Sequence, residues 1–140
     1  MAISKTLQQV IDMVAEVAPD YDFVYANANM MNVKADDAQF PLCYCEEITT
    51  QRYINTAYGR LFKYTSFELY FMRRAPMQGE AMGRDEIREQ IEQEAVLPFL
   101  RAFWARQPQT NAVTGETPPP LFDDNDVAVS IRFEWEEAIC

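Results

Sequence analysis

The sequence contains no histidine, only four glycines and three cysteines, and 12 basic residues against 22 acidic ones. Without histidine, the commonest general base and the usual Ser-His-Asp and Cys-His catalytic arrangements are excluded. Four scattered glycines cannot form a glycine-rich phosphate loop. The net charge of −10 argues against general binding to nucleic acid, because such binding depends on Lys and Arg displacing phosphate counterions.

Long apolar runs and targeting signals are also missing. No apolar run approaches the roughly 20 residues that a membrane helix needs, and the N-terminus does not resemble a signal peptide. We therefore expect a cytoplasmic protein without membrane contact, in a compartment that keeps thiols reduced. The length of 140 residues and the hydrophobic content of 49% predict one folded domain that spans residues 1–140.

The stretch FPLCYCEEI at residues 40–48 is the place where a metal or redox site comes to mind. Side chains alternate across a strand, so a strand here puts Leu42 and Tyr44 with Phe40 on one face and Cys43 and Cys45 on the other. Two cysteines so placed have Cα atoms about 6.5–7 Å apart, too far for an unstrained disulfide. We predict a strand with free thiols.

This stretch does not supply enough ligands for a zinc site either. A structural zinc site needs four ligands, and the remaining cysteine is Cys140, so a site would have to recruit Glu46 or Glu47. The same two glutamates cannot form a catalytic pair, because neighbours on a strand point to opposite faces. The acidic run at residues 123–126 lacks the spacing of a calcium loop and is interpreted as a solvated turn. We expect no metal, no cofactor and no enzymatic activity.

Two amphipathic helices are predicted. Apolar residues recur at three- and four-residue steps between Ser4 and Ala18, where Pro19 ends the pattern. A second helix is predicted from Asp85, as its cap, to Gln107, with a bend at Pro98. The arginines in and before this helix alternate with acids, which indicates a solvated helix face.

Four strands are predicted at residues 21–25, 40–48, 61–74 and 127–136, the second and third paired as an antiparallel hairpin. Strict alternation in the last strand predicts one core face and one wet face. Residues 48–60 are expected to be turn-rich, and residues 108–126 a long irregular excursion stiffened by three prolines. The fold class is α+β: a single mostly antiparallel sheet of about four strands flanked by two helices, in the order α-β-β-β-α-β.

This order of elements resembles a known family. The likeness is carried by DFVYAN at residues 22–27, FPLCYCEEI at 40–48, SFELYFMRR at 66–74 and FDDNDVAVSIRFEWEE at 122–137. The sequence is similar to the tail-terminator (tail completion) proteins of long-tailed bacteriophages and prophages. The proline triplet at 118–120 departs from the family pattern.

The resemblance implies a non-enzymatic structural protein of the virion tail or neck, assembled in the bacterial host cytoplasm. It implies that the chain binds itself in a hexameric ring, caps the tail-tube protein and joins the tube to the head connector. DNA then only passes through the lumen, where acidic walls repel phosphate.

Two segments are candidates for the subunit interface because they lack periodicity yet contain bulky apolar residues. These residues are Tyr53, Ile54 and Tyr58 in the first segment and Val113, Leu121 and Phe122 in the second. Two alternatives stay open. The chain could be a small-ligand or protein-binding module whose aromatic strands line a pocket, or another component of the head–tail connector.

Overall fold

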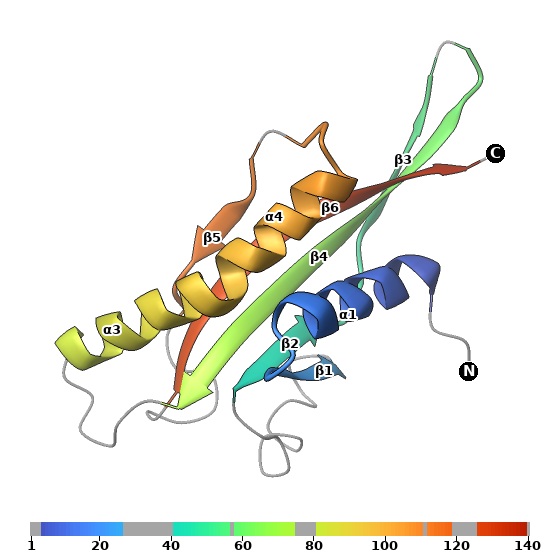
Figure 1. Cartoon of the computed structure of the whole chain (residues 1–140). Helices are drawn as coiled ribbons and strands as arrows, with labels where there is room; N and C mark the ends of the chain where they lie inside the picture. The colour runs from blue at the N-terminus through green and yellow to red at the C-terminus, as the bar shows by residue number, and fades with distance from the viewer. Residues whose placement is uncertain are drawn as a thin grey trace.

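The computed structural model describes residues 4–26, 41–56, 58–74, 81–110, 112–118 and 126–139 (Figure 1). The helical elements are α1 (Lys5–Val17), α3 (Ala81–Ile91), the π-helical turn η1 (Glu92–Val96) and α4 (Leu97–Arg106). The strands are β1 (Asp22–Ala26), β2 (Leu42–Glu46), β3 (Gln51–Asn55), β4 (Leu61–Arg74), β5 (Thr114–Glu116) and β6 (Asp126–Ile139). The predicted α+β class is confirmed.

The strands form one open, mixed sheet of six strands in the order β1-β2-β4-β6-β5, with β3 paired to β4. Only β1 and β2 are parallel, so the sheet is mostly antiparallel as predicted. Strands β4 and β6 pair over their whole length, from Leu61 opposite Ile139 to Arg74 opposite Asp126. This long pair forms the centre of the sheet.

The predicted count of four strands and the order α-β-β-β-α-β are wrong in detail. Strand β3 lies in the segment expected to be turn-rich, and β5 lies in the predicted irregular excursion. Both are short and neither buries an apolar face, so their backbone bonds to β4 and β6 hold them in the sheet. Strands β2 and β4 pair antiparallel as predicted, but the hairpin partner of β4 is β3.

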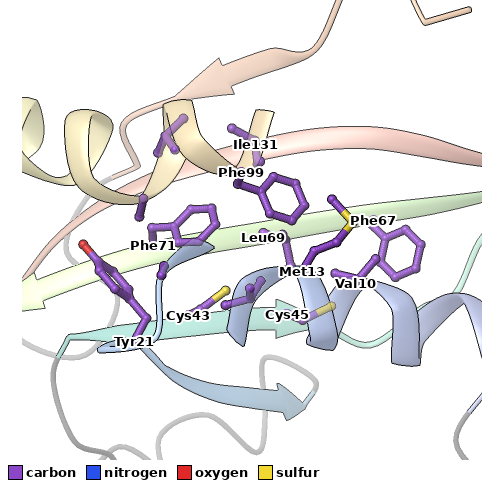
Figure 2. Packing of buried hydrophobic residues seen from close by; sticks show 14 of the residues in the cluster. Val10, Met13, Tyr21, Cys43, Cys45, Phe67, Leu69, Phe71, Phe99 and Ile131 are labelled. Carbon is purple, nitrogen blue, oxygen red and sulfur yellow. The ribbon is translucent and has the colours of Figure 1, made fainter. Parts of the chain in front are cut away.

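Both helical segments cover the same face of the sheet, where the main core lies (Figures 1 and 2). Ser4 caps α1 as its side chain accepts a hydrogen bond from the Leu7 backbone N–H at 3.2 Å. Aromatic rings join α4 to the sheet: the ring centre of Phe133 lies 5.5 Å from that of Phe99 and 4.9 Å from that of Phe103. The predicted first helix is confirmed.

The predicted alternation in β2 is confirmed. Cys43 and Cys45 point into the main core beneath the helices (Figure 2), while Leu42 and Tyr44 join a smaller buried cluster on the opposite face. The two cysteines are free thiols. Burial raises the pKa of the Cys43 thiol well above its ordinary value and, aided by the nearby Glu46 carboxylate, raises the pKa of Cys45 to about 12.

That smaller cluster also corrects the expectation of a wet face on the last strand. Ala128 and Ser130 are buried on the side of β6 that was expected to be solvated. Asp126, expected in a solvated turn, is the buried first residue of β6, and its backbone carbonyl accepts a hydrogen bond from Arg84 at 2.7 Å. Phe40, Cys140 and residues 123–125 lie outside the described residues.

The second helix begins at Ala81, earlier than predicted, so Asp85 lies inside it and does not cap it. Just before Pro98, where a bend is predicted, the structure has the π turn η1, in which the Leu97 backbone N–H bonds the carbonyl of Glu92. A proline ring has no N–H and collides with the turn before it. The wider π turn just upstream of Pro98 accommodates that ring within a continuous helix.

Candidate subunit interface

A β-hairpin extends past the ends of α1 and α4 (Figure 1). We call residues 51–65 the arm: they comprise β3, the connecting turn and the start of β4. The turn closes through a hydrogen bond from the Thr56 N–H to the Arg60 carbonyl at 2.8 Å. Gly59 has a positive φ of 74°, a conformation that glycine adopts without steric cost. The end of β6 lies beside the arm, because Leu61 pairs with Ile139.

The exposed large hydrophobic residues of the described chain gather on the arm and on the strand end beside it. They are Tyr58, 94% exposed, Tyr53, 61% exposed, and Leu61 and Ile139, each 38% exposed. Single exposed apolar residues are ordinary, whereas several at one end of a molecule indicate an interaction surface. The predicted interface residue Ile54 lies among them, partly buried and opposite Phe62.

Three of these side chains share a face. Residues directly opposite each other in an antiparallel pair lie on one side of the sheet, as do residues two apart along a strand. Tyr53 pairs with Lys63, and Leu61 pairs with Ile139, so all four continue the face that carries Phe67 in the core. The apolar face of the sheet therefore runs on beyond the helices that cover it.

The arm also differs from the rest of the chain in charge. It contains Arg52, Arg60 and Lys63 but neither Asp nor Glu, so its formal charge is +3. The other residues carry −13 between them (−10 minus +3). Arg52 is held on the arm, with its guanidinium 4.4 Å from the ring centre of Tyr64 and 3.2 Å from a carboxylate oxygen of Glu134.

A hollow of about 410 Å³ lies at the opposite edge of the sheet, between β5 and the continuous helix formed by α3, η1 and α4. We call it the β5 groove; its lining is mostly apolar and includes Val96, Leu97, Leu100, Val113, Val129 and, at its acidic positions, Glu92 and Glu116. Val113, one of the predicted interface residues, therefore lies here and packs against the core. Leu121 and Phe122 lie outside the described residues.

A second hollow, of about 760 Å³, lies on the sheet face that the helices leave uncovered. We call it the acidic hollow because its lining includes Glu46, Glu47, Glu68, Glu134 and Glu136 together with Arg132. Arg132 lies 3.3 Å from the Glu68 carboxylate, and burial together with Glu68 raises the pKa of Glu46. Glu46 and Glu47 both line it, contrary to the prediction of opposite faces, because β2 ends at Glu46.

No group of three or more His, Cys, Asp or Glu side chains within the described ranges is arranged to hold a metal ion. The metal-free state of the thiols remains a prediction, which metal analysis of protein purified without chelator checks. Sequence reasoning located Tyr53 and Tyr58 but missed Leu61, Ile139 and both hollows. The acid-free stretch of residues 48–67 was visible in the sequence and marks the arm.

In comparisons with known proteins, no protein-family model matches this sequence, and no curated protein matches it. Among the helices that the structure describes, none combines the length and apolar character that crossing a membrane requires.

Proposed function

We propose that this chain is a non-enzymatic structural subunit that assembles with copies of itself into a ring, of the kind that the tail-terminator resemblance implies. In this proposal the ring, a hexamer, caps the tail tube of a phage or prophage and joins the tube to the head connector. Packaged DNA passes through the lumen, and the protein is found in the virion. The observation that carries the proposal is the concentration of exposed apolar side chains on the arm.

The apolar surface of the arm is large enough to support association in a ring but too small to give a stable dimer by itself. Burying one large apolar side chain contributes about 1.5–3 kcal/mol. A stable interface buries about 1,200–2,000 Å² in total, more than a few side chains of one hairpin supply. A closed ring gives every subunit two such contacts, so weak pairwise contacts suffice once the ring closes.

The positions of the two buried cysteines support a non-enzymatic role. Cys43 and Cys45, whose thiols have raised pKa values, lie in the core and line neither hollow. A catalytic nucleophile instead needs a lowered pKa and access to substrate.

Imaging of phage or tail-like particles tests the proposal. A strain without the gene should produce overlong tubes or tails detached from heads, and the intact gene should restore uniform joined tails. A gene with Tyr53→Asp and Tyr58→Asp should fail to restore them, whereas the exposed helix variant Gln9→Asp should succeed. Uniform, head-joined tails in the strain without the gene would contradict the proposal.

A second candidate is a small-ligand-binding module, favoured by the acidic hollow of about 760 Å³. Five carboxylates and one guanidinium in its lining suit a cationic ligand such as a polyamine. Calorimetric titration with spermidine tests this role. Binding that Glu68→Gln weakens would favour the module, and an absence of heat change at millimolar ligand would eliminate this ligand class.

A further inference from the structure

We infer that the arm of one subunit docks in the β5 groove of the next subunit, so that the ring is built from head-to-tail contacts. The inference rests on the proposed function in requiring self-assembly, and it adds which two surfaces meet. The partner is therefore a second copy of this chain.

The placement of the two surfaces is the first argument. Strand β3 pairs β4 on the side where β2 lies, and β5 forms the opposite edge beyond β6. The arm and the β5 groove share no residue, so one subunit can use both at once. An interface between two different surfaces repeats in one direction, and it closes into a ring when the rotation allows.

The chemistry of the two surfaces is the second argument. The arm presents Tyr53 and Tyr58, large rings with a polar tip, which need an apolar slot with a wet rim. The β5 groove offers such a slot between Leu100 of the helix and Val113 beside β5. Its hollow of about 410 Å³ is roomy enough for a tyrosine side chain.

Charge is the third argument. The arm has no acid and carries Arg60 and Lys63 beside Arg52, which lies 3.2 Å from Glu134 of β6. The β5 groove includes Glu92 and Glu116, and its one arginine, Arg88, lies 3.7 Å from Asp85. Opposite potentials raise the association rate and set the orientation of docking, an effect that salt weakens. A basic, aromatic hairpin also suits nucleic acid. The net charge of −10 disfavours that partner, which becomes one outcome of the test.

Complementation between two damaged variants tests the inference. The arm variant carries Tyr53→Glu and Tyr58→Glu, and the groove variant carries Glu116→Arg and Thr117→Arg; all four positions are exposed, so both chains should fold. Sedimentation velocity at high protein concentration and low salt should show each variant alone as a monomer. Their 1:1 mixture should form dimers that grow no further, because one intact contact remains between the two chains.

Disulfide trapping makes the same test sensitive to weak contacts. Both variants receive Cys140→Ser; the groove variant also receives Asn55→Cys, and the arm variant receives Thr117→Cys. Oxidation of the mixture should give a cross-linked heterodimer at least ten times faster than oxidation of either variant alone. A mixture that neither dimerises nor cross-links above the single variants would overturn the inference, as would dimers formed by one variant alone.

The outcomes separate this inference from the proposed function. If the gene with Tyr53→Asp and Tyr58→Asp fails to restore tails while the mixture never cross-links, the ring proposal stands and the docking site is wrong. If intact protein shifts a DNA duplex in a gel, the arm variant does not, and the mixture stays monomeric, the arm binds nucleic acid and the inference is overturned. If tails are normal without the gene, the ring proposal itself has failed.

Discussion

The helix-covered body and the arm are two ends of the same sheet, and they differ in the exposure of their apolar side chains: these are buried in the body and exposed on the arm. Strand β4 passes through both: Phe67 and Phe71 are buried under the helices, while Leu61 on the same face is 38% exposed. Between them on this face lie Lys63 and Thr65, so the face becomes more polar where the helix cover ends. One alternating sequence thus supplies a core where helices pack on it and an interaction surface where they end.

The body and the arm also differ at their strand edges, because the edge of β6 is covered and the edge of β3 is open. In the body, the buried Gln107 side chain accepts a hydrogen bond from the Glu136 backbone N–H at 2.9 Å and donates one to the Glu136 carbonyl at 3.1 Å. It thereby occupies the outer edge of β6 beyond the end of β5. The outer edge of β3 has no strand partner among the described residues. An open edge of this kind is a ready surface for another chain.

The largest expected effect is a loss of stability in the helix-covered body. Ile131→Asp places an unpaired charge in the core, where Ile131 is 2% exposed, and should lower the free energy of unfolding by several kcal/mol. The neighbour Arg132 points to the other face, with its side chain 63% exposed. Arg132→Ala should cost less than about 1 kcal/mol. Urea unfolding compares the two, and equal losses would contradict the assigned register of β6.

The next effect concerns the protected edge. Gln107→Leu keeps the side chain's bulk but removes both bonds to Glu136, leaving its backbone groups without that partner. We expect a loss of about 1–3 kcal/mol in urea unfolding. Gln109→Leu, whose only described side-chain bond is to Gln107, is the matched control and should cost clearly less. Equal losses would mean that the edge bonds contribute nothing.

A smaller, pH-dependent effect comes from the polar link between sheet and helix. The Glu94 carboxylate accepts hydrogen bonds from Arg73 and, at 2.6 Å, from the Tyr21 hydroxyl. Burial opposes the charge of Glu94, but these hydrogen bonds outweigh burial and lower its pKa. A lowered folded-state pKa stabilises the fold above the unfolded pKa of about 4.3, and this stability is lost as pH falls through the folded value.

Glu94→Gln should therefore reduce the free energy of unfolding by about 1–2 kcal/mol at pH 7. The difference from the intact protein should shrink as the pH falls below the unfolded-state pKa of about 4.3, and it should vanish below the lowered folded-state pKa, where the Glu94 carboxyl is also uncharged. Urea unfolding at a series of pH values measures this difference. The exposed Glu89→Gln on the same helix should show little effect at any pH. A difference that stays constant down to pH 3 would contradict the role of the Glu94 charge.

How much the sequence could predict follows the same division. Strict alternation located β6, an aromatic strand pattern located β4, and the three- and four-residue steps located α1, because each of these elements buries an apolar face. Strands β3 and β5 have no such face and depend on hydrogen bonds to neighbours far along the chain. The exposure of Tyr53 and the shelter of Val113 follow from where the helices end, which no local pattern encodes.

The smallest expected effect on stability sharpens the comparison most. Tyr53→Asp and Tyr58→Asp together should change the free energy of unfolding of the monomer by less than about 0.5 kcal/mol per site, because surface substitutions usually stay within that range. If the arm is an interaction surface, the same pair should abolish self-association. A control pair on the helical side of the body, Gln9→Asp and Glu89→Gln, should leave both properties intact. Thermal melts at low protein concentration measure stability, and sedimentation at high concentration measures association. A large loss of stability in the arm pair would show that the two tyrosines support the fold itself, and the distinction between body and arm would then be wrong.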